Sequence, residues 1–346
     1  MAGVGKTTLA RGLVEWLAAT EGLGEGCFWF TFNDIRSSEY VFNQMVEPLF
    51  GAHAMAADLA QKQALLVEAF KKRRFILVWD NFESATGIPG TPLEARLPEL
   101  DRQWLWAFLG KLRGGASKVI ITSRSPEAWL GSDRCFPLSL GGLQGEERWE
   151  YCATILRDLG LDADQQDAEL KTLMELLDGH PLAMRVLLPR LEKVSAYTLI
   201  SKLRGQLNES NSANCSIQVQ LQGRLFTVLD FVVDSLPLEL KPLLIFLVYY
   251  DRFLHLLALE MIAKQAGCQC GRVEIEKFLY ILVGAGLLRL LDEGMYEMHS
   301  ALKDFLRFRF LENDTNNASS KGTWQHSLTE LMELLANKLT RKEIIS

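Results

Sequence analysis

The first 140 residues alternate between short apolar runs and longer segments in which apolar residues recur with helical spacing. Short, mainly apolar runs predict strands, and they occupy residues 27–32, 75–80, 118–123 and 135–140. Apolar residues at every third or fourth position predict helices after Gly5, at 38–49, at 56–72 and from near Asp101, whose side chain we expect to cap its own helix. Strands alternating with helices predict a parallel sheet covered on both faces, with ligands at the carboxyl ends of the strands.

Beyond residue 145 the pattern is helical. Predicted helices cover residues 146–159, 168–177, 225–234, 238–249, 254–266, 273–283 and 328–339. Gly179 suits the end of one helix and Pro181 the first turn of the next. The polar segment 206–222 predicts a linker or long loop, and residues 287–291 with 295–298 predict a short hairpin. The expected fold class is therefore α/β followed by all-α.

The start of the chain matches the end of the phosphate-loop pattern G-x-x-x-x-G-K-[ST], without its first glycine. The matching residues are Gly3, Val4, Gly5, Lys6, Thr7 and Thr8. A helix follows directly, so unpaired backbone N–H groups and the positive end of the helix dipole would meet the phosphates of a nucleotide. Lys6 would reach the β and γ phosphates, and the Thr7 hydroxyl would hold Mg²⁺. A Gly-rich turn ahead of an ordinary helix is the alternative.

Charged residues follow two of the predicted strands. Asp80 ends an apolar run in the Walker B pattern, in which a buried strand carries a carboxylate to the sheet rim, where it holds Mg²⁺. Glu83 is the candidate general base for the attacking water; a solvated loop residue with negligible hydrolysis is the alternative. Arg124, in the string Thr122-Ser123-Arg124, would sense the γ phosphate with its guanidinium; a surface arginine is the alternative.

Composition narrows the classes of protein. The chain has 346 residues, of which 48% are hydrophobic and 23% charged, enough for two or three globular domains. A net charge of -6 argues against nucleic-acid binding by bulk electrostatics. Scattered cysteines are typical of a reduced, cytoplasmic protein, and the close pair Cys268 and Cys270 lacks the partners of a zinc site. Charged residues interrupt the most apolar run, 236–259, so no membrane span is predicted.

Four motifs occur in a characteristic order: Gly3–Thr8, Phe75–Asp80, Thr122–Arg124 and Gly179–Leu182. With these motifs the chain resembles the NB-ARC branch of the STAND ATPases, over about residues 1–310. The resemblance implies ATP and ADP as ligands, with Mg²⁺, and it implies that Pro181 packs near the adenine of ADP. It also implies a winged-helix domain ending in a Met-His-Asp motif whose histidine touches the ADP phosphates. Met298, His299 and Ser300 match that motif, with serine in place of the acid.

Pattern and resemblance together divide the chain. We expect a P-loop nucleotide-binding domain at 1–142, a helical subdomain at 143–205, a linker at 206–222, a winged-helix domain at 223–310, and a flexible segment with the start of a further helical region at 311–346. The strand expected ahead of the phosphate loop is not in the sequence. We therefore expect an N-terminally truncated sequence, or one that begins at the wrong methionine, with weakened nucleotide binding.

The leading hypothesis is a nucleotide-operated switch of a signalling protein. ADP would hold the domains closed, ATP would open them and permit self-association, and slow hydrolysis would reset the switch. Sensor and effector domains are expected to flank this chain. One alternative is a transcriptional regulator whose winged helix contacts DNA, but Glu274 and Glu276 on the would-be reading helix make nucleic acid an unexpected partner. The other alternative is a degenerate scaffold that does not hydrolyse nucleotide.

Overall fold

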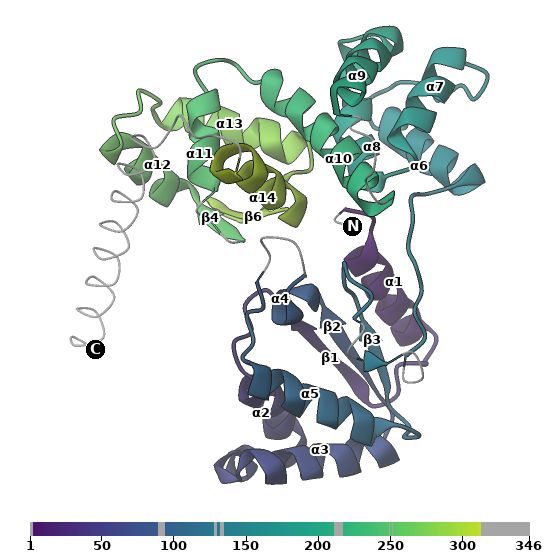
Figure 1. The fold of residues 1–346 in the computed structure, drawn as a ribbon, viewed down its shortest axis with the longest axis vertical. Helices are drawn as coiled ribbons and strands as arrows, with labels where there is room; N and C mark the ends of the chain where they lie inside the picture. Colours follow the sequence, from purple (N-terminus) through teal and green to yellow (C-terminus); the bar gives the residue numbers. More distant parts are fainter. Residues whose placement is uncertain are drawn as a thin grey trace. The chain divides into compact units, whose positions relative to one another are not determined.

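The computed structural model describes residues 3–88, 94–127, 130–131, 135–210, 217–248, 250 and 252–312. The chain divides into two compact units (Figure 1). Gly5–Leu140 form the sheet unit, and Met1–Val4 with Gly141–Ser346 form the helical unit. Among the described residues, none of the helices combines the length and the apolar character that crossing a membrane requires.

The sheet unit is built on three parallel strands in the order β1-β2-β3. They are β1 (Gly26–Thr31), β2 (Phe75–Asp80) and β3 (Lys118–Ile121), which confirms three of the predicted strands and the parallel sheet. Thr31 pairs with Asp80, and Trp79 pairs with Ile121. The strands therefore end level with one another, and the residues that follow them meet at one edge of the sheet.

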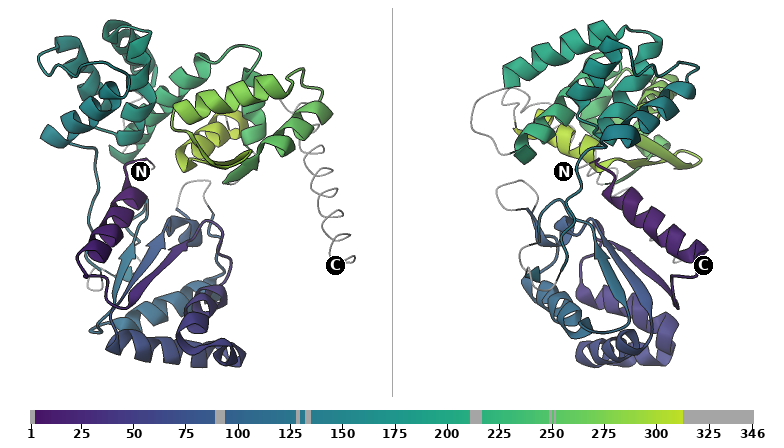
Figure 2. Two further views of the ribbon diagram at one scale, coloured as in Figure 1. Left: turned by 180° about the vertical axis from the view of Figure 1, so that it is seen from behind. Right: turned by 90° about the vertical axis from the view of Figure 1, so that its right-hand side faces the viewer.

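Alternate residues of β2 face opposite helical layers. Phe75, Leu77 and Trp79 join the core under α2 (Ser38–Phe50), α3 (Leu59–Lys72) and α5 (Glu99–Leu112). Ile76 and Val78 pack instead with Ala10 of α1 (Lys6–Ala19). Both views of Figure 2 show this layering, with the dark purple α1 on one side of the strands and the blue helices on the other. Burial on both faces explains why β2 is apolar at every position before Asp80.

Two expectations for the sheet unit are wrong. Residues 135–140 form no strand, and Phe136 and Leu138 are 91% and 72% exposed. A strand needs a hydrogen-bonded neighbour, and the described sheet ends at β3.

Asp101 does not cap α5, which begins after Pro98 without a side-chain cap. Its Oδ1 instead accepts hydrogen bonds from the backbone N and the hydroxyl of Ser38, at 2.6 and 2.7 Å, and so ties α5 to the start of α2.

Short elements complete the sheet unit: η1 (Ala52–Ala56) and α4 (Glu83–Thr86). The helical unit begins with α6 (Gly145–Arg157), α7 (Ala168–Leu177), α8 (Pro181–Leu187), η3 (Leu188–Glu192), α9 (Ala196–Ser210) and α10 (Ile217–Asp234). It continues with η4 (Lys241–Leu243), α11 (Leu244–Leu247), β4 (Phe253–His255), α12 (Leu256–Gln265), α13 (Arg272–Gly284), β5 (Leu288–Asp292), β6 (Met295–Met298), α14 (Ser300–Arg307) and η5 (Phe308–Glu312). One apolar core extends from Cys152 to Leu306.

The helical unit confirms the helix start at Pro181 and the hairpin β5-β6, and it corrects three other expectations. The predicted loop 206–222 is helical at both ends, in α9 and α10, because polar residues are tolerated wherever a helix needs only one apolar face. Residues 211–216 lie outside the described residues, as does the helix predicted at 328–339.

The other two corrections concern residues 238–255. The helix predicted at 238–249 is reduced to the short turns η4 and α11. The first residues of the helix predicted at 254–266 belong instead to β4. This strand pairs antiparallel with β6, in a sheet of order β4-β6-β5. Three residues are too few to show the alternation that predicts a strand, so pairing with β6 determines that this segment is extended.

Candidate functional site

The phosphate-loop residues lead into α1 through a glycine with left-handed backbone. Gly5 has φ +93° and ψ +13° and occupies the position before the helix, where a residue with Cβ would be strained. Leu9 N donates to Gly5 O at 2.8 Å, which is the first helical hydrogen bond. The N–H groups of Lys6, Thr7 and Thr8 therefore stand ahead of the helical ladder, and no side chain caps this end of α1.

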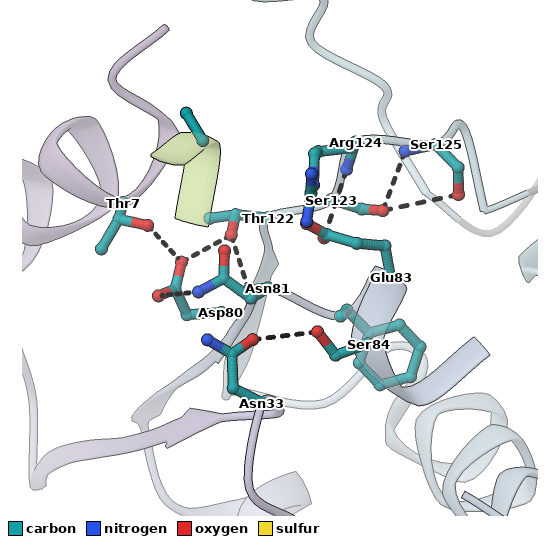
Figure 3. Close-up of polar contacts among 12 residues, drawn as sticks. Thr7, Asn33, Asp80, Asn81, Glu83, Ser84, Thr122, Ser123, Arg124 and Ser125 are labelled. Atoms are coloured by element: carbon teal, nitrogen blue, oxygen red, sulfur yellow. Dashed lines mark hydrogen bonds and ion pairs between the residues drawn. The ribbon is translucent and has the colours of Figure 1, made fainter. Parts of the chain in front are cut away.

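Asp80 meets two threonine hydroxyls at the carboxyl end of the sheet (Figure 3). Its Oδ1 accepts from Thr7 Oγ1 at 2.8 Å and from Thr122 Oγ1 at 2.6 Å. The Thr122 hydroxyl in turn accepts from Asn81 N at 3.1 Å. Asp80 is 2% exposed, so these bonds fix the direction of a buried carboxylate. Sequence reasoning missed Thr122, although it stands in the same Thr-Ser-Arg string as Arg124.

Thr7 and Asp80 could together supply the protein ligands of a magnesium site that nucleotide phosphates would complete. Mg²⁺ prefers oxygen ligands and is commonly held by one or two protein groups, with water and phosphate supplying the rest. Thr7 offers a hydroxyl and Asp80 a carboxylate, one hydrogen bond apart. The described residues contain no group of three or more His, Cys, Asp and Glu suited to a metal.

The buried Glu83 and the half-buried Arg124 form an ion pair beside Asp80. The side chain of Glu83 is 1% exposed and that of Arg124 16%. Glu83 Oε1 accepts from Arg124 Nε at 2.6 Å, and Glu83 Oε2 accepts from Arg124 N at 3.3 Å. The carboxylate thus holds both the guanidinium and the backbone N–H of Arg124, the third residue after β3, as Figure 3 shows. Neither residue is the solvated surface group of the alternative interpretations.

Lys6 shares this charged cluster. Burial lowers the pKa of its ammonium, the nearby Glu83 acts in the opposite direction, Arg124 lowers it further and Asp80 raises it. Two cations, Lys6 and Arg124, thus lie within electrostatic range of two carboxylates, Asp80 and Glu83. The structure brings together Lys6, Thr7, Asp80, Glu83 and Arg124, all of which were predicted for the site from sequence.

A second buried carboxylate, which sequence reasoning missed, fixes the loop after Arg124. Glu127 is 6% exposed and has φ +47°. It accepts from Ser125 Oγ at 2.9 Å, from Thr86 Oγ1 at 3.2 Å and from the Ser123 hydroxyl. Thr86 ends α4, the helix that Glu83 begins. The loop is therefore held against α4 at two points, through Glu83 and through Glu127.

In the helical unit, Pro181 begins α8 as predicted, with His180 as its cap. His180 Nδ1 accepts from Ala183 N at 3.2 Å. Gly3 packs on this joint, since Leu182 N donates to Gly3 O at 3.3 Å. A Cβ on Gly3 would lie 2.9 Å from His180 Cε1 and from Leu182 Cβ. Val4, which follows Gly3, is 5% exposed. The contact gives Gly3 a packing role that the phosphate-loop motif does not reveal.

His299 caps α14 in the helical unit. Its Nδ1 accepts from Ala301 N at 3.1 Å, and its backbone N donates to Leu287 O at 2.9 Å. Ser300, which replaces the acid of the Met-His-Asp motif, is the first residue of this helix. Both α8 and α14 pack against α10. Pro181 and His299 therefore each stand at the start of a helix supported by the same neighbour.

Comparison with known proteins identifies the fold. No family model matches the chain, and no curated protein matches its sequence. Its structure is similar to the crystal structure of a STAND protein with a tetratricopeptide repeat sensor from Pyrococcus horikoshii, with a TM-score of 0.52 and 17% identity over 95% of this chain. The fold is that of a P-loop NTPase. The chain spans 42% of the length of that archaeal protein, and at this identity the P-loop NTPase fold alone is shared.

Two further neighbours are weaker. The Walker-type ATPase of Pyrococcus abyssi aligns with 88% of this chain and 88% of its own, at 12% identity and a TM-score of 0.38. The Aeropyrum pernix ORC1 protein, described in complex with DNA, aligns with 89% of this chain and 84% of its own, at 14% identity and a TM-score of 0.35. At these TM-scores neither carries an argument about this chain.

Proposed function

We propose that this chain binds ATP and ADP with Mg²⁺ and acts as the nucleotide-operated switch of a cytoplasmic signalling protein. The observation that carries the proposal is the 2.8 Å hydrogen bond from Thr7 Oγ1 to Asp80 Oδ1, beside the half-buried Lys6. A phosphate-loop hydroxyl and a strand-end carboxylate at hydrogen-bond distance are the two protein groups that hold Mg²⁺ against the phosphates in P-loop NTPases.

Each site residue has a role in this proposal. The N–H groups that follow Gly5 and the Lys6 ammonium bind the phosphates, while Thr7 and Asp80 hold Mg²⁺. Arg124 senses the γ phosphate. Gly3 and Val4 complete the loop, and Pro181 and His299 contact ADP, on the strength of the NB-ARC resemblance.

The switching part of the proposal rests on the resemblance and on the archaeal neighbour, which is described as a signal transduction ATPase. ADP stabilises a closed state, and ATP opens it and permits self-association, with slow hydrolysis as the reset. The β4-β6-β5 sheet with α12, α13 and α14 serves as the winged-helix domain at 223–310, after the P-loop domain at 1–142 and the helical subdomain at 143–205. Sensor and effector segments belong to flanking parts of the protein.

Calorimetry with the full chain tests the nucleotide site. Wild-type protein is expected to bind Mg-ADP, and Lys6→Ala is expected to lose at least about tenfold in affinity, because the ammonium supplies a charge-assisted contact to phosphate. Lys72→Ala is the matched control, because Lys72 is an exposed lysine of α3 paired with Glu68 at 2.7 Å. Equal affinity of wild type and Lys6→Ala would refute the site.

Co-purifying nucleotide separates the switch from the degenerate scaffold. We expect ADP in protein denatured directly after purification, and we expect Mg-ADP to raise the midpoint of thermal unfolding, because a ligand of the folded state adds about 2.7 kcal/mol at a hundredfold excess over Kd. An empty protein with no thermal shift would support the scaffold.

A further inference from the structure

The Glu83–Arg124 pair engages the carboxylate that would activate water and the guanidinium that would bind the γ phosphate. Glu83 accepts one hydrogen bond on each carboxylate oxygen, from Arg124 Nε at 2.6 Å and from Arg124 N at 3.3 Å. A carboxylate paired with a guanidinium in this way is a weaker base towards water than one that has released it. Likewise, a phosphate that takes the Nε–H donor of Arg124 has to displace the Glu83 carboxylate from it.

The charges of the cluster favour such an exchange only when a third phosphate arrives. Lys6 and Arg124 balance Asp80 and Glu83, so the four groups sum to zero formal charge. A γ phosphate adds negative charge close to Lys6, and it then competes with Glu83 for Arg124. ADP lacks this group, so with ADP the pair stays intact.

The surrounding contacts allow the side chain to move without its backbone. Glu127 holds the loop after Arg124 through Ser125, Ser123 and Thr86. Thr122, two residues before Arg124, is fixed to Asp80 and Asn81. Arg124 is thus anchored on both sides, and rotation about its side-chain bonds is the motion left for reaching a ligand.

We infer that Glu83 is a positioning residue that holds Arg124 until a γ phosphate replaces it, so that exchange of this one guanidinium lets the site distinguish ATP from ADP. The inference rests on the proposed nucleotide site. It also orders two events: the transfer of Arg124 comes first, and only then is the Glu83 carboxylate available to water. Glu83 therefore restrains hydrolysis before it can assist it.

Calorimetry with Mg-ADP and with a Mg-bound, non-hydrolysable ATP analogue tests the inference on the full chain. Glu83→Gln removes the charge and keeps the shape, so we expect the preference for the analogue over ADP to rise by at least about fivefold, the lower end of typical coupling between ligands. The same substitution in an Arg124→Ala background is expected to leave the preference unchanged. Glu25→Gln is the matched control, because Glu25 pairs with Arg73 at the opposite end of β1.

Two outcomes overturn the inference while leaving the nucleotide site standing. The first is an unchanged preference in Glu83→Gln, and the second is the same rise with and without Arg124, which would mean that Glu83 merely repels phosphate. Failure of the proposed function is distinct: nucleotide binding is then absent from wild type or unaffected by Lys6→Ala, and the inference falls with it.

A measurement on wild-type protein covers the case in which Glu83→Gln does not fold. In side-chain ¹⁵N spectra, the Arg124 Nε–H resonance, assigned with Arg124→Lys, is expected to shift on adding the ATP analogue and to stay in place on adding ADP. Equal responses to the two nucleotides would overturn the inference.

Discussion

Thr122 uses one hydroxyl for two hydrogen bonds, donating to Asp80 Oδ1 and accepting from Asn81 N. Thr122→Val keeps the shape and removes both bonds at a position that is 6% exposed. We expect the free energy of unfolding to fall by about 1–3 kcal/mol, because a buried N–H group and a buried carboxylate lose a partner. Urea denaturation measures the loss, and Thr122→Ser should restore most of it. A Val variant as stable as wild type would show that Thr122 does not position Asp80.

The lowered pKa of Lys6 predicts that the stability of the protein changes at alkaline pH. Its pKa in the folded protein is lowered from 10.5 by burial, so the folded state loses the proton at a lower pH than the unfolded chain. The unfolded chain then binds more protons, and stability rises with pH through the window that ends near 10.5. Relative to Lys6→Met, wild type should gain unfolding free energy as the pH rises towards that limit. A constant difference across the window would contradict the buried ammonium.

At the scale of single elements, substitutions of His299 at the start of α14 distinguish a helix-capping role from a ligand-binding role. His299→Ala removes the acceptor for Ala301 N and should cost about 0.5–2 kcal/mol in urea denaturation. His299→Asn supplies another capping acceptor and should restore the stability. If His299 also contacts ADP, the Asn variant keeps the fold but loses ADP affinity. Unchanged affinity in that variant would leave His299 with the cap alone.

Helix α13 tests the DNA alternative. Its first turns carry Glu274, which accepts from Gly271 N at 3.0 Å, and Glu276, which pairs with Arg272 at 2.9 Å. Acidic groups fixed at this helix start would repel phosphates. We expect no salt-dependent retention of the chain on a DNA column at about 0.1 M salt, where surface charges still act over roughly 10 Å. If the chain is retained, and if Glu274→Gln and Glu276→Gln strengthen that retention, DNA binds at α13.

At the scale of the whole molecule, the sheet unit alone assembles the charged cluster. Its parallel strands end level, so Asp80, Arg124 and the start of α1 meet within Gly5–Leu140. The helical unit builds its own core and presents Pro181 and His299 at helix starts. The proposed switch assigns one job to each unit: the sheet unit binds phosphates and metal, and the helical unit responds to the nucleotide that is bound.

The sequence by itself determined the class of the fold and named most residues of the candidate site. Apolar runs and helical spacing located β1, β2, β3 and α1, and Lys6, Asp80, Glu83 and Arg124 followed from their places next to these elements. Such features are local, because apolar residues recur along a buried strand or an amphipathic helix with a period that consecutive residues show.

Only the tertiary structure decided which groups face one another. The bond from Thr122 to Asp80 spans 42 positions of sequence, and the pair of Glu83 with Arg124 spans 41. It also decided that 135–140 is no strand and that 253–255 is one, since strand formation requires a neighbour to supply hydrogen bonds. Contacts between distant segments depend on register and packing, which no local pattern records.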